Sequence, residues 1–263
     1  NPLNKSMGYL RTSLLPGLMK AADLNIKHSN SDIRIFELGH VHIISDSIST
    51  GIEERKYLSG IVMGDIIGES VHCDPKAEDL FSLKGYLEAL FEKKLSMRIE
   101  INNTIDSPGF ELARSVSINR QEIGKMGRIS SDWIRSMGLD LETVYGFELN
   151  LEPLQRMFGR KRSFKKVNPY PKIVRDLNLV MPEEQEVGSI IEIFHKKGKK
   201  LLINSKPVDV FMDEDSIGKH MKSVTFSLVF QDPSKTLEDK DVNPIIDEII
   251  RVAENHFNAK LRT

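Results

Sequence analysis

Histidine and carboxylate pairs are the residues of this chain whose types and spacing could support metal binding or acid–base chemistry. His40 and His42 stand two apart in a strand-like segment, so both could face one metal ion. A histidine pair without a third ligand is more typical of a solvated strand face. The carboxylate pairs Glu53-Glu54 and Glu183-Glu184 lie in polar stretches and suit solubility. No GxxxxGK[ST], GxGxxG, HExxH or GxSxG motif is present. We therefore assign no catalytic and no metal-binding residue.

Two runs rich in Lys and Arg, residues 160–166 and 195–200, could instead bind an anion. The whole chain has a net charge of −1, but from Gly159 onward 19 Lys and Arg stand against 16 Asp and Glu. Such runs are more often solvated faces or linkers, so on their own they do not identify a nucleic-acid-binding protein.

The second half of the chain shows the elements that would position a binding face. The apolar spacing predicts strands around residues 177–179 and at 201–211, 223–230 and 259–262, with helices over 187–194 and 242–257. This βαββαβ order is that of a ferredoxin-like unit, in which the helices cover one face of the sheet and leave the other open.

The period of two in these strands assigns side chains to the two faces. The inward set is Leu177, Leu179, Val208, Val210, Val224, Phe226, Leu228, Phe230 and Leu261. The outward set is Asp176, Asn178, Asp209, Phe211, Ser223, Thr225, Ser227, Lys260 and Arg262. An aromatic ring among short polar groups and cations suits single-stranded RNA. The alternative is an ordinary solvated face on which Phe211 packs over a loop.

The first half alternates short strands with a few helices. Helices are predicted from residue 13, with Pro16 in the first turn, and over residues 79–95. A mostly apolar strand at residues 32–38 is expected to lie inside a covered sheet. Residues 152–168 are polar and basic, so we place the domains at 1–158 and 164–263.

Length and composition are those of a soluble, two-domain protein. The chain has 263 residues, 40% of them hydrophobic and 29% charged. No window approaches the roughly 18 apolar residues of a membrane helix. A single cysteine, Cys73, fits a reducing cytoplasm. The Asn-Pro-Leu start has no Met and no signal pattern, so we expect it to be the cut end of a longer chain.

Several segments resemble the β subunit of bacterial-type phenylalanine–tRNA ligases, in its order and along nearly the whole chain. They are Asn1-Pro2-Leu3; residues 10–18 (LRTSLLPGL); Phe36-Glu37-Leu38-Gly39; Asp79-Leu80-Phe81 with Leu83-Lys84-Gly85; Ile123-Gly124 through Gly127; Pro171 with Arg175-Asp176; Phe230-Gln231-Asp232 with Lys235-Thr236-Leu237; and Leu261-Arg262. Two segments depart from the family's pattern. Ser107-Pro108-Gly109-Phe110 stands where HPGRSA is common, and Val208-Asp209-Val210-Phe211 keeps the ring of FDxY but loses its hydroxyl.

The resemblance implies that this is the C-terminal part of a β subunit. Its first domain would have the class II synthetase fold, an antiparallel sheet with flanking helices, without that class's ATP motif. It would pack against the α subunit and the rest of β in an (αβ)₂ heterotetramer. Aminoacylation, with ATP and Mg²⁺, would take place in the α subunit, so no cofactor is expected here. The second domain would bind the tRNA(Phe) anticodon.

For the anticodon site, the resemblance implies roles for the ring of Phe211, the hydroxyl of Ser223 and the guanidinium of Arg262. Asp209 and Lys260 complete our candidate RNA-binding set, since they share the outward face. Two alternatives remain open: a stand-alone regulatory or RNA-binding module whose ferredoxin-like half binds a small ligand, and an independent ligase.

Overall fold

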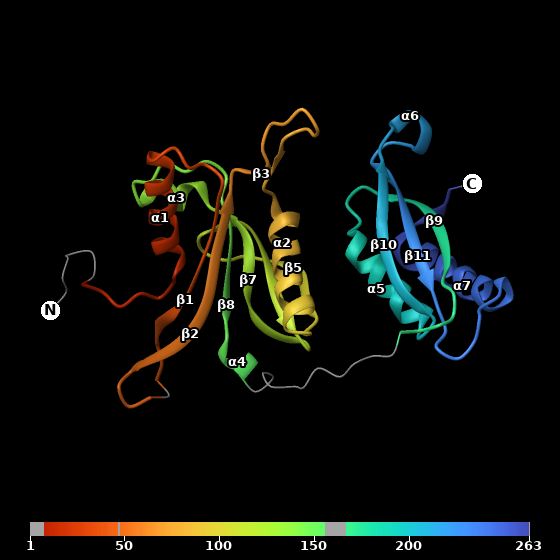
Figure 1. Cartoon of the computed structure of the whole chain (residues 1–263), viewed down its shortest axis with the longest axis horizontal. Coiled ribbons are helices and arrows are strands. Elements are labelled where there is room, and N and C mark those ends of the chain that lie inside the picture. Colours follow the sequence, from red (N-terminus) through yellow and green to blue (C-terminus); the bar gives the residue numbers. More distant parts are fainter. Residues whose placement is uncertain (1–7, 47, 156–166, 263) are drawn as a thin grey trace. The chain divides into compact units, whose positions relative to one another are not determined.

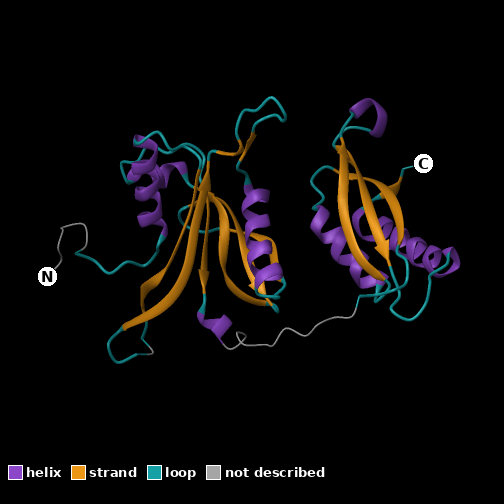
Figure 2. Cartoon of the chain, viewed as in Figure 1, coloured by secondary structure: helices purple, strands orange, loops and turns teal. Residues whose placement is uncertain are grey.

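A computed structural model of the chain describes residues 8–46, 48–155 and 167–262. The chain forms two compact units, Asn1–Ser163 and Phe164–Thr263. Each unit is built on an antiparallel sheet flanked by helices (Figure 2). The basic run at residues 160–166 lies outside the described residues.

The first unit contains a six-stranded sheet of order β1-β2-β8-β7-β6-β5, in which all neighbouring strands are antiparallel (Figure 1). Its elements are α1 (Leu15–Lys27), β1 (Ile33–Ile44), β2 (Ile52–Met63), β3 (Asp65–Ile67), β4 (Lys76–Ala77), α2 (Leu80–Glu88), the π-helix η2 (Ala89–Lys94), β5 (Ile99–Ile105), β6 (Phe110–Ile118), β7 (Gln121–Ile129), α3 (Ser131–Ser136), β8 (Tyr145–Asn150) and α4 (Glu152–Gln155).

Helices cover the two faces of this sheet unequally. On one face, α1 and α3 enclose a core around Met19 and Ile61. On the other, the predicted apolar stripe of α2 and η2 is buried through Leu83, Leu87 and Phe91. A capping box starts α2: the Asp79 carboxylate accepts from the Ser82 N–H, and the Ser82 hydroxyl oxygen accepts from the Asp79 N–H.

The prediction that the strand at residues 32–38 lies inside a covered sheet was wrong. β1 is an edge strand, and on the face shared with α2 its side chains Phe36 and Leu38 are 74% and 53% exposed. The opposite face of β1 is buried under α1, which accounts for part of the apolar run. The face with Phe36 and Leu38 stays open because α2 packs against β5 and β8 instead. Nothing within the described part of the chain covers Phe36.

The second unit is a four-stranded sheet of order β10-β11-β9-β12. Its elements are β9 (Ile173–Pro182), α5 (Val187–Gly198), β10 (Leu202–Phe211), α6 (Glu214–Ile217), β11 (Met221–Phe230), α7 (Asp239–Phe257) and β12 (Lys260–Leu261). The predicted βαββαβ order is confirmed, with α6 as an addition in the acidic connection between β10 and β11.

The core of this unit lies between α5, α7 and one face of the sheet. The predicted inward residues of β9 and β11 are confirmed as buried: Leu177, Leu179, Val224, Phe226, Leu228 and Phe230. Phe226 meets Phe194 of α5 edge to face, with ring centroids 4.9 Å apart.

Three residues predicted to point into the core are instead partly exposed: Val208, Val210 and Leu261. Val210 pairs with Val224 and Leu261 with Leu179, so both do lie on the helix face, but on the two edge strands. Val208 is the extra residue of a β-bulge between Pro207 and Asp209. Edge positions at strand ends have fewer neighbours to cover them.

Candidate nucleic-acid interface

The open face of the second sheet carries its polar residues in rows that run across the strands. In one row Phe211 of β10 pairs with Ser223 of β11, Ser223 with Val180 of β9, and Val180 with Lys260 of β12. In the next row Asp209 pairs with Thr225, and Thr225 with Asn178. Directly opposed residues project to the same face, so both rows share one surface.

The bulge at Val208 sets which residues of β10 reach this surface. Lys206 pairs with Ser227 on the open face, and Pro207 pairs with the buried Phe226. Without an extra residue, the next outward position would be Val208. The bulge shifts the phase by one residue, so that Asp209 and Phe211 face outward instead.

Three of the predicted residues come together in one cluster. The Arg262 guanidinium lies over the Phe211 ring, with its central carbon 4.8 Å from the ring centroid. The same guanidinium donates through Nη1 to the Ser223 hydroxyl oxygen at 3.4 Å. Ser223 is only 2% exposed, whereas Phe211 is 39% exposed. The ring is therefore reachable from solvent, and the hydroxyl lies beneath the arginine.

Sequence reasoning missed the part that Asn178 plays in this cluster. Its side-chain oxygen accepts from the Ser223 hydroxyl at 2.6 Å, and its main-chain carbonyl accepts from the Arg262 N–H at 3.0 Å. The signal was available, since the alternation around Leu177 and Leu179 turns Asn178 outward. Only the register of β11 against β9 reveals that it lies next to Ser223.

Asp209 and Lys260 share the open face but stand apart from the cluster. Both side chains are exposed. Lys199 and Lys200, from the second basic run, are exposed at the turn between α5 and β10. Lys197 of the same run instead donates to Glu248 of α7 at 2.9 Å. This run is thus divided between a helix–helix contact and solvated cations.

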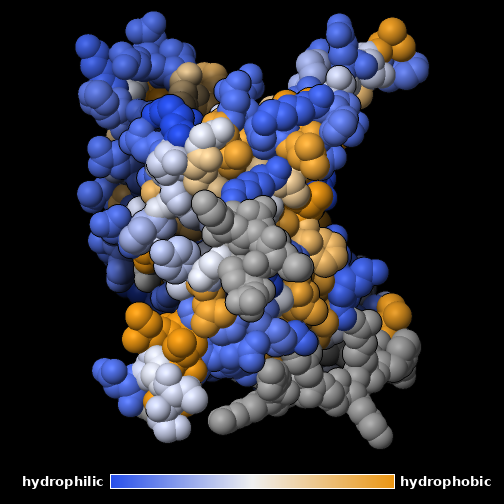
Figure 3. Space-filling view, turned by 90° about the vertical axis from the view of Figure 1, so that its left-hand side faces the viewer, coloured by the Kyte–Doolittle hydropathy of each residue, from blue (hydrophilic) through white to orange (hydrophobic). Residues whose placement is uncertain are grey.

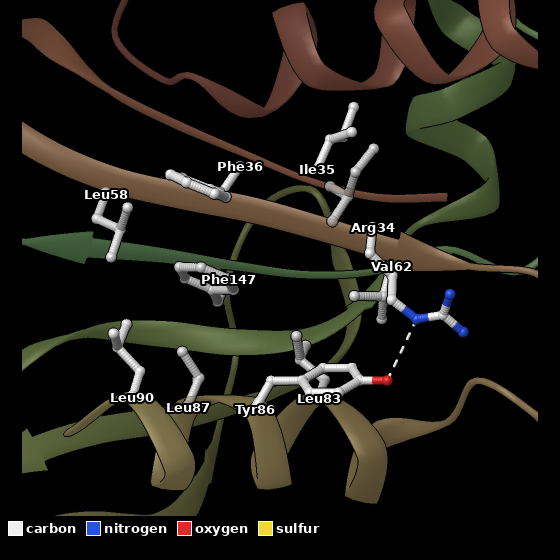
Figure 4. A pocket seen from close by; sticks show the side chains of 11 residues that line it. Arg34, Ile35, Phe36, Leu58, Val62, Leu83, Tyr86, Leu87, Leu90 and Phe147 are labelled. Atoms are coloured by element: carbon white, nitrogen blue, oxygen red, sulfur yellow. Dashed lines mark hydrogen bonds between the residues drawn. The ribbon is translucent and has the colours of Figure 1, made fainter. Parts of the chain in front are cut away.

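The first unit carries a second candidate surface, an apolar pocket of about 390 Å³ between α2, η2 and the strands β1, β2 and β8 (Figure 4). Its lining includes Phe36, Leu58, Leu87, Leu90 and Phe147. Figure 3, which views the side of the molecule that is at the left in Figure 1, shows hydrophobic residues gathered in patches among hydrophilic ones.

A charged group closes one end of this pocket. The Arg34 guanidinium donates to the Tyr86 hydroxyl at 3.2 Å and forms an ion pair with the buried Glu78. Burial lowers the pKa of Arg34, but the hydrogen bonds to Tyr86 and Glu78 outweigh it and raise that pKa above its ordinary value. The pocket wall is therefore apolar, and its one charged lining residue is an arginine whose charge is balanced by Glu78.

The histidine pair does not belong to a metal-binding cluster among the described residues. His40 Nδ1 and His42 Nε2 lie 3.7 Å and 3.9 Å from the Glu54 carboxylate. No helix in the described ranges is long and apolar enough to cross a membrane.

Both units match domains of a known protein family. The phenylalanyl tRNA synthetase beta chain CLM domain matches residues 1–151, and the ferredoxin-fold anticodon binding domain matches residues 168–262. The phenylalanine–tRNA ligase β subunit of Clostridium tetani is 31% identical over 100% of this chain and 32% of its own length. The chloroplastic β subunit of Phaeodactylum tricornutum is 32% identical over 100% of this chain and 38% of its own. The chain thus spans about a third of the length of these curated relatives.

A solved pyrrolysyl tRNA synthetase from Desulfitobacterium hafniense is also similar, at a TM-score of 0.43 and 17% identity over 56% of this chain and 49% of that one. A likeness at that level supports no conclusion.

A CLM domain followed by a ferredoxin-fold anticodon-binding domain defines the class of protein, one built from domains of the aminoacyl-tRNA synthetase kind. The chain belongs to the phenylalanyl tRNA synthetase β chain family, as its motifs indicated.

Proposed function

We propose that the second unit binds the anticodon of phenylalanine tRNA through the open face of its sheet. The convergence of Phe211, Ser223 and Arg262 in one cluster, with the ring and the guanidinium exposed and the hydroxyl beneath them, carries this proposal. A ring supplies a stacking platform for a base, and a guanidinium and a hydroxyl supply polar contacts beside it.

Each residue of the cluster has a distinct part in this proposal. A base stacks on the exposed part of the Phe211 ring, while Arg262 remains beside it as a cation–π partner. Ser223 and Arg262 then contact the edge of the base or its phosphate. Asp209 and Lys260 act at the margin of the same face, where Lys260 is placed to meet phosphate and Asp209 to accept from base amino groups.

The first unit, in the same proposal, is a packing domain rather than a catalytic one. It would contact the catalytic α subunit and the rest of the β polypeptide in an (αβ)₂ assembly, working in the cytoplasm. The exposed apolar residues Phe36 and Leu38 and the pocket beside them support a contact of this kind. ATP and Mg²⁺ would act in the α subunit, where phenylalanine is activated and transferred.

The anticodon proposal is tested by Phe211→Ala in the 263-residue chain, using fluorescence anisotropy of a labelled anticodon stem-loop of phenylalanine tRNA. Stacking is worth about 1–3 kcal/mol per base, so the dissociation constant should rise roughly ten- to a hundredfold. Phe81→Ala is the matched control, since Phe81 is an exposed ring in the first unit. An unchanged affinity in Phe211→Ala, together with a lowered melting temperature, would show that the ring only packs against its own loop.

A further inference from the structure

Asn178 contacts two groups of the proposed RNA-binding cluster at once. It lies on the central strand β9, its side chain next to Ser223 and its main chain next to Arg262. It is itself neither aromatic nor charged, and neither the family match nor the motifs assign it a role.

The hydrogen-bond directions in this cluster follow from what each group is able to donate. A guanidinium only donates, so the contact between Arg262 Nη1 and Ser223 Oγ requires a lone pair on the serine oxygen. The single serine proton must then point elsewhere, and Asn178 Oδ1 lies 2.6 Å from that oxygen. Asn178 thereby fixes the Ser223 hydroxyl as an acceptor on its outer side.

Because Ser223 is buried, its hydroxyl depends on Asn178 for this orientation. With Ser223 only 2% exposed, little water can replace Asn178 as the acceptor for the serine proton. If Asn178 were absent, the proton would be free to turn toward the guanidinium and repel it. Arg262 would still be attached through its main-chain N–H to the carbonyl of residue 178, but its side chain would lose its anchor over the ring.

We infer that Asn178 is a positioning residue of the RNA-binding face: it orients the Ser223 hydroxyl and thereby holds the Arg262 guanidinium over Phe211. This inference rests on the proposed function for its consequence in RNA binding. Its structural part, the orientation of Arg262, can be measured without RNA.

The first measurement uses the RNA-free chain. A side chain stacked on a ring carries a ring-current shift, so the side-chain NMR signals of Arg262 should be displaced in the wild type. Asn178→Leu, which is close to isosteric but cannot accept, should return these signals toward their random-coil positions. Asn178→Asp keeps the acceptor and should preserve the displacement. Unchanged Arg262 signals in Asn178→Leu would overturn the inference, whatever happens to RNA binding.

The second measurement is a double-mutant cycle with the anticodon stem-loop. Asn178→Leu should weaken binding roughly three- to tenfold, as expected for one hydrogen bond, but less than about twofold in a Ser223→Ala background. Equal losses in both backgrounds would refute action through Ser223. If Phe211→Ala weakens binding and Asn178→Leu does not, the inference fails and the anticodon site stands; if neither does, the anticodon site fails as well. Should Asn178→Leu lower the melting temperature, Asn178→Ala repeats both measurements with the same criteria.

Discussion

Both units pack helices against an antiparallel sheet, but the surfaces that they leave uncovered differ in chemical character. In the second unit, α5 and α7 cover one face of a four-stranded sheet, and the other face carries hydroxyls, charges and a single ring. In the first unit, helices flank both faces, yet α2 stops short of β1 and β2 and leaves Phe36, Leu38 and Leu58 beside an apolar pocket. A polar face with a ring suits a hydrated, charged partner such as RNA. Exposed apolar side chains beside an apolar pocket suit another protein surface.

The strongest test of this comparison is to remove one aromatic ring from each face of the second sheet. Phe226 and Phe211 lie on neighbouring strands and on opposite faces. Phe226→Ala should lower the free energy of unfolding of the second unit by about 3–5 kcal/mol, because it empties a fully buried site against Phe194. Phe211→Ala should cost less than about 1 kcal/mol, because the ring is partly exposed.

Urea unfolding of the two variants, followed by far-UV circular dichroism, provides the measurement. Comparable losses in both would mean that Phe211 is a core residue and that the open face is not open.

The apolar surface of the first unit predicts the next largest effect. Phe36→Ser should weaken association with the catalytic α subunit roughly thirtyfold, the cost of removing one aromatic hot spot worth about 2 kcal/mol. Phe81→Ser is the matched control, because Phe81 is as exposed as Phe36 but does not line the pocket.

Calorimetric titration of the purified α subunit with each variant measures this effect. Equal losses from both substitutions would place the contact outside the pocket, and no loss from either would remove the first unit from the interface.

The second basic run should contribute a smaller and less specific effect. Lys199→Ala with Lys200→Ala should weaken binding of all anticodon stem-loops alike and reduce the slope of log affinity against log salt by about 0.7 for each phosphate that is no longer neutralised. Lys93→Ala with Lys94→Ala removes the same charge from the first unit. Affinities measured from about 50 to about 300 mM salt distinguish the Lys199/Lys200 variant from the Lys93/Lys94 control, whose salt dependence should equal that of the wild type. A loss confined to one anticodon sequence would show that these lysines read bases.

The smallest expected effect is a pH dependence of the contact between α5 and α7. Hydrogen bonds from Lys197 and then Arg251 lower the pKa of Glu248 from its ordinary 4.5. A lowered carboxylate pKa stabilises the fold above 4.5 and loses that contribution as the pH falls through the folded value. The melting temperature of the chain should therefore decline on acidification by slightly less in Glu248→Gln than in the wild type. Parallel acid curves would show that these surface hydrogen bonds do not matter to stability.

Periodicity in the sequence was enough to predict the second unit because its two central strands, β9 and β11, each have one buried face. The alternation of Val224, Phe226, Leu228 and Phe230 predicted β11 and its inward face, and the stripe around Ile249 predicted α7. The same logic placed Ser223 and Phe211 outward, and register confirms that orientation. Whether these residues bind an anticodon is not decided by their orientation and stays a prediction.

The failures arose where the environment depends on distant parts of the chain. An apolar run such as residues 32–38 has the same composition in a central strand and at an uncovered edge, so β1 could not be assigned from its own residues. The bulge at Val208 leaves no signal in the alternation of its neighbours. The contact of Asn178 with Ser223 depends on the pairing of two strands, since these two residues are 45 positions apart in the sequence.

The irregular path of β10 has a further consequence, for the solubility of the protein. β10 is an edge strand, and an edge strand offers unpaired N–H and C=O groups to any other chain. At its middle, Pro207 has no N–H to offer, Lys206 brings a charge, and the bulge bends the strand out of the regular ladder. These features oppose the addition of a fifth strand from a second copy. The sheet can therefore keep one face uncovered without its β10 edge pairing with another chain.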